Sequence, residues 1–150
     1  MKPVLFVFSA LLPLALVSGA ARAEGRLYEI KKTEPKVAAG GQGTASVTIA
    51  TKGGWHMNAE APITMKVIPP AGISVPKPKL GRSDLAQSTP ESARFDIAFA
   101  ATETGQKVMN AETHFVICQE SACKPVTETV ALNIEVTSAK QADLTKPKKK

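Results

Sequence analysis

The feature that most constrains the fold is an alternation of apolar and polar residues with a period of two. It is clearest in residues 126–136, where five aliphatic residues stand at even positions and mostly polar residues stand at odd positions. Because successive side chains of a β-strand point to opposite faces, this pattern predicts a half-buried strand. The same reasoning predicts further strands at residues 26–33, 44–51, 63–68, 94–101 and 106–118.

Turn-forming clusters rich in glycine and proline separate the predicted strands, and no ten-residue helical stretch lies between them. Short strands separated by such turns predict an all-β protein, an immunoglobulin-like sandwich of two antiparallel sheets. A parallel α/β fold is excluded because it needs helices between strands. The segment from Pro69 to Pro90 holds five prolines, so we expect it to be mostly a long loop that crosses from one sheet to the other.

The amino terminus has the three-part layout of a secretory signal. After Met1 and Lys2, an apolar run from Val4 to Val17 contains five leucines, and small residues follow up to Ala23. This layout predicts a signal peptide of residues 1–23 that is removed on export. The run is shorter than the about 20 residues of a spanning helix, so we expect no membrane span in the mature protein. The expected location is the periplasm or the medium.

The remaining chain predicts one β-sandwich domain at residues 24–139 and a disordered, lysine-rich tail at residues 140–150. The net charge is +6, of which the signal accounts for two and the tail for four, so the predicted domain is neutral. A nucleic-acid-binding protein would carry its basic residues on a folded surface, interleaved with aromatic residues. We therefore expect no nucleic-acid partner. We also expect the protein to be a monomer.

Cys118 and Cys123 are the only cysteines, and they stand between two predicted strands. A hairpin with a four-residue loop would place them directly opposite each other, where paired Cβ atoms lie about 4.5 to 5.5 Å apart. That separation is close to what a disulfide requires. In an exported protein this even count at this spacing predicts an intramolecular disulfide.

The residues alone leave two roles open for this disulfide. A bridge that closes so short a loop stabilises by only about 2 kcal/mol on chain-entropy grounds. A bond at an exposed hairpin tip is also accessible to another protein's thiolate, which is what disulfide exchange requires. The pair is therefore either a structural staple of the hairpin or a reversible redox pair.

Three segments resemble the amino-terminal domain of the thiol:disulfide interchange protein DsbD family. The segment from Phe115 to Glu128 looks like that family's cysteine hairpin, in which a proline opens the closing strand. The segment Gly54 to Ala59, followed by Ala61-Pro62-Ile63, resembles its Gly-aromatic-His-x-Asn element, and Pro69 to Ile73 resembles its Pro-x-Gly turn. In order and spacing, the resemblance covers nearly all of the predicted domain.

The resemblance implies an immunoglobulin-like fold in which Cys118 and Cys123 alternate between disulfide and dithiol and relay electrons to periplasmic partners. Full-length members of the family continue into a membrane-embedded electron-transfer domain and a thioredoxin-like domain. A stand-alone exported domain would need an external partner of one of these kinds, a thioredoxin-like protein or a membrane electron-transfer protein. Without such a partner, the fold would serve binding and the cysteines would be a staple.

Two neighbours of the cysteines are candidate activating groups. His114 is four residues from Cys118, which is about 13 Å along an extended strand, so the two side chains are not expected to touch. Lys124 favours a thiolate at Cys123, but Glu120 in the same loop opposes it. The sequence therefore predicts no strongly activated cysteine.

The one metal considered is copper, with His56 and Met57 as ligands and Met65, Met109 and His114 as a wider set. These residues do not form a tight cluster in the sequence, and the inward parity of Met65 and Met109 favours a place in the core. His56 is expected to make a structural hydrogen bond beside Trp55, and Trp55 is expected to pack between the sheets. We therefore expect no metal site and no cofactor.

No nucleophile, phosphate-loop or zinc motif is present, so the sequence carries no hydrolase or transferase signature. Two main hypotheses follow, and a copper-handling protein that uses His56 and neighbouring methionines is a distant third. The first is a periplasmic thiol-disulfide relay or partner-docking domain that uses a reversible Cys118–Cys123 pair. The alternative is a non-catalytic, exported β-sandwich binding protein with a purely structural hairpin disulfide.

Overall fold

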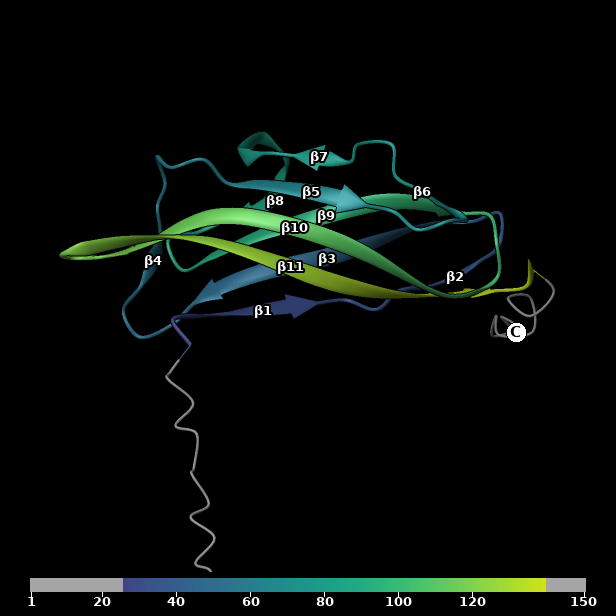
Figure 1. The fold of residues 1–150 in the computed structure, drawn as a ribbon, viewed down its shortest axis with the longest axis horizontal. Coiled ribbons are helices and arrows are strands. Elements are labelled where there is room, and N and C mark those ends of the chain that lie inside the picture. The colour runs from purple at the N-terminus through teal and green to yellow at the C-terminus, as the bar shows by residue number, and fades with distance from the viewer. Residues whose placement is uncertain (1–25, 140–150) are drawn as a thin grey trace, which may run out of the picture.

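The computed structural model describes residues 26–139 as two β-sheets packed face to face (Figure 1). The predicted signal peptide and the lysine-rich tail lie outside the described residues. The first sheet contains β1 (Tyr28–Lys32), β3 (Gln42–Thr51), β9 (Ser92–Ala101) and β6 (Ile73–Ser74) in that order, with β8 (Leu85–Ser88) also paired to β9. The second contains β2 (Lys36–Ala38), β11 (Ala122–Thr137), β10 (Gly105–Gln119), β5 (Thr64–Ile68) and β7 (Lys79–Leu80), with β4 (His56–Met57) also paired to β10.

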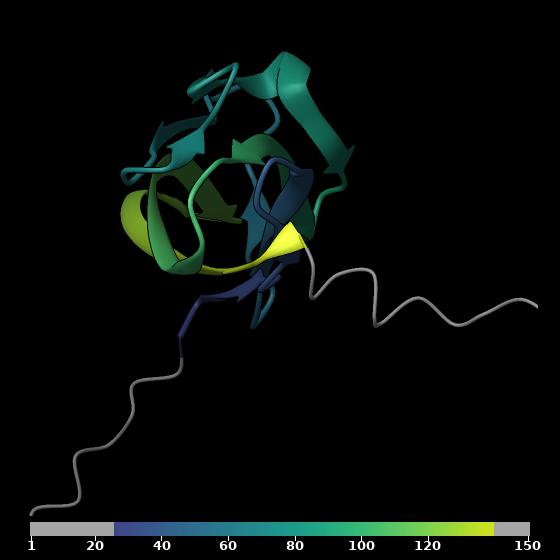
Figure 2. The ribbon, with the colours of Figure 1, turned by 90° about the vertical axis from the view of Figure 1, so that its right-hand side faces the viewer.

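All strand pairs are antiparallel except that of β2 with β11, which is parallel. Seen from one end, the two sheets form two layers around a common interior (Figure 2). The fold is an immunoglobulin-like β-sandwich, as the alternating pattern predicts, and all six expected strands are present. No helix in the described part of the chain has the length and apolar character needed to cross a membrane.

The core lies between the sheets and is built from one parity of each long strand. In β3 and β9 the buried residues face the second sheet, and in β10 the odd-numbered residues face the first sheet. Met65 and Met109 are both buried in this core, which confirms the role expected for them. Burial of apolar side chains from both layers is the main force that holds the sheets together.

The proline-rich segment from residue 69 to 90 contains more regular structure than the predicted long loop. It begins with a tight turn in which Gly72 has a φ of 78° and the Ile73 N–H donates to the Pro70 carbonyl at 3.1 Å. It then contributes β6 to the first sheet, β7 to the second sheet, the short 3-10 helix η1 (Arg82–Asp84) and β8 to the first sheet. The segment thus crosses between the sheets more than once, and its prolines lie outside these short strands.

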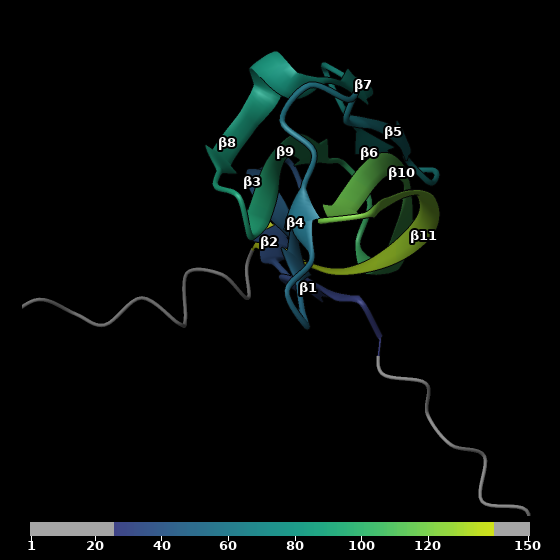
Figure 3. The same cartoon turned by 90° about the vertical axis from the view of Figure 1, so that its left-hand side faces the viewer.

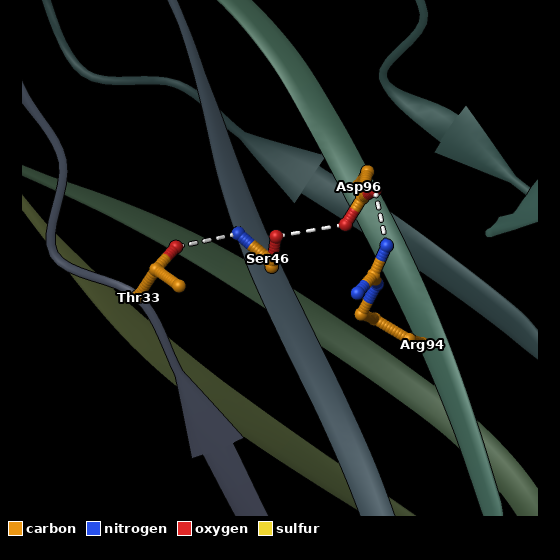
Figure 4. Close-up of polar contacts among 4 residues, drawn as sticks. All are labelled: Thr33, Ser46, Arg94 and Asp96. Atoms are coloured by element: carbon orange, nitrogen blue, oxygen red, sulfur yellow. Dashed lines mark hydrogen bonds and ion pairs between the residues drawn. The ribbon is translucent and has the colours of Figure 1, made fainter. Parts of the chain in front are cut away.

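Polar side chains pair across the outer face of the first sheet. The Thr33 hydroxyl accepts from the Ser46 N–H at 2.8 Å, and the Ser46 hydroxyl donates to Asp96 at 2.7 Å (Figure 4). Arg94 forms an ion pair with the second Asp96 oxygen at 3.1 Å. Ser46, Arg94 and Asp96 stand at the parity opposite to the core, so hydrogen bonds and an ion pair link neighbouring strands on this outer face.

Candidate functional site

The two cysteines close the end of the long β10–β11 hairpin. Cys118 is the register partner of Cys123, their Cα atoms lie 4.0 Å apart, and the two sulfurs form a disulfide. The expected disulfide and the expected opposition of the cysteines are therefore both present. The ladder continues for one more pair beyond them, so the turn consists of Glu120 and Ser121 rather than of four residues.

The disulfide lies on the outer face of the second sheet. Odd-numbered residues of β10, such as Phe115 and Ile117, are buried against the first sheet, so Cys118 points to the other side. The bond joins neighbouring strands of one sheet and does not connect the two sheets. It is consequently a local feature of the hairpin tip, not a clamp on the core.

The two cysteines have different surroundings. Cys118 is only 5% exposed, whereas Cys123 is exposed. β4 pairs with the end of β10 and brings His56 opposite Cys118. Asn58, the residue that follows β4, donates from Nδ2 to the Cys118 sulfur at 3.3 Å. The Cys118 sulfur is therefore covered by a neighbouring strand and a side-chain amide, whereas the other sulfur belongs to an exposed residue.

Asn58 is held in place by four further hydrogen bonds. Its backbone N–H donates to the Val116 carbonyl at 2.9 Å, and its side-chain oxygen accepts from the N–H groups of Glu60 and Ala61 at 2.8 and 2.9 Å. Its carbonyl accepts from the Arg82 guanidinium at 3.2 Å. Because two N–H donors face the side-chain oxygen, the amide nitrogen must be the atom that faces the sulfur.

Trp55 and Lys124 meet at the opposite face of the tip. The Lys124 ammonium lies 5.6 Å from the centre of the Trp55 ring, a cation–π contact. Lys124 is the register partner of Ile117, so its side chain points away from the disulfide and does not favour a thiolate there. Trp55 packs against the core as expected, but it is only half-buried and so lies at the margin of the core rather than fully between the sheets.

A cleft of about 490 Å³ opens beside the disulfide, at the end of the sandwich that Figure 3 faces. One wall is the segment from β4 to β5, and the other is formed by η1, β8 and the turn that follows β8. Most of its lining is apolar. Asn58 lines the cleft as well as contacting Cys118, so the cleft and the disulfide adjoin. The lining residues are His56, Met57, Asn58, Ala59, Pro62, Ile63, Arg82, Leu85, Ser88, Thr89, Pro90, Ala93 and Val116.

The walls of the cleft are tied to each other by polar contacts. The Met57 N–H donates to the Pro90 carbonyl at 2.6 Å, which joins β4 to the turn after β8. Arg82 donates to the carbonyls of Asn58 and Ala61, which joins η1 to the opposite wall. The cleft is therefore largely preformed, as small-molecule and peptide sites usually are.

A second groove, of about 480 Å³, lies between β1 and β11 and is lined mainly by charged and polar residues. Tyr28 stands in it, stacks edge-to-face on Phe115 at 5.2 Å and donates its hydroxyl proton to Glu128. Burial, together with this hydrogen bond to a carboxylate, raises the pKa of Tyr28 to about 12. The groove thus contains a neutral tyrosine tied to an acid, and its groups are already engaged with one another.

The structure separates the candidate copper ligands. Met65 and Met109 are in the core, and His114 hydrogen-bonds to Glu112 and Thr127, both at 2.9 Å. His56 and Met57 are adjacent in β4 and so point to opposite faces. His56 is exposed, and its side chain makes no hydrogen bond within residues 26–139, so the structural hydrogen bond expected for it is absent. Within the described part of the chain, no cluster of three or more His, Cys, Asp or Glu side chains could bind a metal.

Sequence reasoning found the disulfide but missed Asn58 and Arg82 as parts of the site. Asn58 lies sixty residues before Cys118 and Arg82 lies on the far wall of the cleft. The single hint was the position of Asn58 inside the Gly-aromatic-His-x-Asn element. Nothing local to the sequence indicates that its amide reaches a sulfur.

No protein-family model matches the chain, and no curated protein matches it. Among solved structures, AggA, the major subunit of aggregative adherence fimbriae type I from Escherichia coli, is 10% identical with a TM-score of 0.41, over 73% of this chain and 94% of that one. WR4, a C. elegans MSP family member, is 7% identical with a TM-score of 0.37, over 75% and 98%. The PapD-like domain 7 of human CEP192 is 12% identical with a TM-score of 0.36, over 91% and 97%.

Proposed function

We propose that this chain is an exported, non-catalytic binding domain that takes an extended peptide segment of a partner protein into the cleft beside the disulfide. The observation that carries the proposal is the preformed, mostly apolar cleft of about 490 Å³. This volume is in the range of ligand sites, and its few polar groups would orient an otherwise apolar occupant. In this role the disulfide stiffens the hairpin tip that forms one border of the site.

The position of β8 supports a peptide as the occupant. Within residues 26–139, β8 pairs with β9 on one side and with no strand on the other. An extended peptide can add to such an edge through main-chain hydrogen bonds, while a neighbouring pocket accepts one of its side chains. Leu85 and Ser88 of β8 line the cleft, so a strand added there would lie at its mouth.

The burial of Cys118 supports a structural role for the disulfide. One sulfur is covered by Asn58 and β4, and the bond continues a ladder that is already regular on both sides. A staple at this position limits fraying of the last pairs next to a short turn. Exported proteins commonly use disulfides in this way.

The test is selection of peptides from a displayed library of random dodecamers on the purified domain, followed by affinity measurement with synthetic copies. Ser88→Trp fills the mouth of the cleft from an exposed position, and Gln87→Trp is the matched control, since Gln87 is its neighbour in β8 and does not line the cleft. We expect peptides with an apolar anchor whose binding is lost in Ser88→Trp and kept in Gln87→Trp. Failure to select any peptide, or equal binding by both variants, would contradict the proposal.

A second candidate function is thiol-disulfide exchange, and the exposure of Cys123 at the hairpin tip is the observation that favours it. The resemblance to the amino-terminal domain of the DsbD family supports the same role, with a periplasmic thioredoxin-like protein or a membrane electron-transfer protein as partner. The reduction potential of the pair separates the two functions. A value above about −250 mV favours exchange, and one below about −300 mV marks a structural bond.

We also propose that the protein acts in the periplasm or outside the cell, as its predicted signal peptide indicates. The test is expression of the whole chain in a bacterium with a periplasm, followed by mass spectrometry of the periplasmic fraction. We expect a mature protein that begins at Glu24. Recovery of the uncleaved chain in the cytoplasm would contradict this location.

A further inference from the structure

The disulfide is accessible from one direction only. Thiol-disulfide exchange requires a thiolate to approach one sulfur from the side opposite the other sulfur, along the line of the S–S bond. The bond runs from β10 to β11, and the strand beyond β10 at this point is β4, with Asn58 against Cys118. Beyond β11, β2 pairs only with Glu135–Thr137, so no strand of the described residues flanks Cys123. A thiolate can therefore reach the Cys123 sulfur and is blocked from the Cys118 sulfur.

Attack at Cys123 leaves a negative charge on Cys118. In the balanced step, the electron pair of an external thiolate forms a new S–S bond with Cys123, and the electron pair of the old S–S bond goes to Cys118. The products are a mixed disulfide on Cys123 and a Cys118 thiolate. That thiolate forms at a site only 5% exposed to water, where an anion is costly unless a hydrogen bond stabilises it.

We propose that Asn58 is a positioning residue whose side-chain amide stabilises the Cys118 thiolate and so makes Cys118 the leaving group. Its nitrogen already donates to this sulfur at 3.3 Å. The N–H groups of Glu60 and Ala61 hold the side-chain oxygen, so the amide cannot rotate to present oxygen to the sulfur. The donor is thus in place before the charge develops, and no reorganisation is required.

Besides this amide, few charged groups lie where they could change the stability of the Cys118 thiolate. His56 is opposite Cys118 on β4, and Glu120 stands in the turn. Lys124 faces the other side of the sheet, over Trp55. The inference does not depend on peptide binding by the cleft, and it concerns any thiol that opens the bond, whether a partner protein's or a reagent's.

The sharpest variant is Asn58→Asp. Aspartate keeps the side-chain oxygen that Glu60 and Ala61 require, but it replaces the N–H donor with a second oxygen and a negative charge. The matched control is Asn110→Asp, which adds the same charge to the outer face of β10, eight residues from Cys118. Asn58→Ala serves as the uncharged variant. Thermal unfolding of each oxidised protein shows whether the variant is folded.

The measurement is the rate of opening of the oxidised domain by reduced glutathione, with peptide mapping of the trapped mixed disulfide. We expect glutathione on Cys123, a rate lowered roughly tenfold in Asn58→Asp and less in Asn58→Ala, and no change in Asn110→Asp. In the reduced proteins, the pKa of the Cys118 thiol should rise in Asn58→Asp and stay unchanged in Asn110→Asp. Glutathione on Cys118, or equal rates and equal pKa values in the two aspartate variants, would overturn the inference.

These outcomes are distinct from those of the peptide experiment. A domain that binds no peptide can still show the effect of Asn58, and a domain without that effect can still bind peptides.

Discussion

Along the β10–β11 hairpin, the residues around Met109 and Phe115 lie against the first sheet, whereas the tip around Cys118 and Cys123 extends beyond that sheet (Figure 1). Both regions belong to one unbroken ladder with the same register. The body is held by apolar burial between two layers, while the tip is held by the disulfide, the Asn58 amide and the Trp55–Lys124 contact. Identical backbone pairing therefore rests on different forces in the two regions. Mutations in the body should destabilise the whole domain, whereas mutations at the tip should act locally.

The largest expected effect is that of Phe115→Ala in the body. Phe115 is 2% exposed and stacks on Tyr28, so its loss leaves a cavity in the core. We expect the free energy of unfolding to fall by about 3–5 kcal/mol, measured by urea denaturation. Val108→Ala, in the same strand on the exposed outer face, should change it by less than about 0.5 kcal/mol. Equal losses in the two variants would show that the body is not held by burial.

The next effect in size is that of removing the disulfide with Cys118→Ala and Cys123→Ala together. The bond closes a short loop, so the chain-entropy estimate is a loss of about 2 kcal/mol. Hydrogen exchange should quicken at the amides near the turn and stay unchanged in the body, because the bond joins neighbouring strands of the second sheet and does not cross to the first sheet. Chemical reduction of the wild-type protein should reproduce this pattern. A loss of unfolding free energy as large as that of Phe115→Ala would show that the disulfide supports the body as well as the tip.

A smaller effect is expected from Tyr28, which links β1 of the first sheet to the hairpin. Its pKa is raised to about 12, chiefly by burial, so the folded protein holds the phenol proton more tightly than the unfolded chain, whose tyrosine titrates near 10. The stabilisation is complete below about pH 10 and is lost as pH rises toward about 12. Because the Tyr28 hydroxyl is only partly buried, solvent screening reduces this contribution, and urea denaturation at pH 9 and pH 11 should show a decrease of about 1 kcal/mol in the wild type. Tyr28→Phe should lack this decrease, and an identical decrease in both would rule out Tyr28 as its source.

The smallest effect is that of Lys124→Met at the tip. This change removes the charge above Trp55 and keeps an apolar chain of similar length, so we expect a loss of about 0.5 kcal/mol. The emission of Trp55, the single tryptophan, should change, and hydrogen exchange in the body should not. Lys79→Met, an exposed lysine in β7, is the control. A global loss of stability in Lys124→Met would show that the tip and body are coupled.

The strands and the cysteine pair could be predicted because their evidence is local. Alternation along residues 126–136 marks the inward face of β11, and the same parity argument placed Met65 and Met109 in the core. The spacing of Cys118 and Cys123 indicated that they face each other across a hairpin. Trp55 shows the limit of such reasoning. Its size favoured the interior, but it packs only against the margin of the core and lies half-buried under Lys124.

By itself, the sequence determined the all-β class, the two-sheet sandwich, the position of the long strands and the presence of a disulfide at a hairpin tip. Side-chain periodicity and cysteine spacing decide these features within a few residues of chain. Only the tertiary structure decided which sulfur is covered, because the pairing of β4 with β10 and the contact of Asn58 with Cys118 join segments sixty residues apart. The cleft likewise depends on how β8 and η1 lie across from Asn58, which no local pattern encodes.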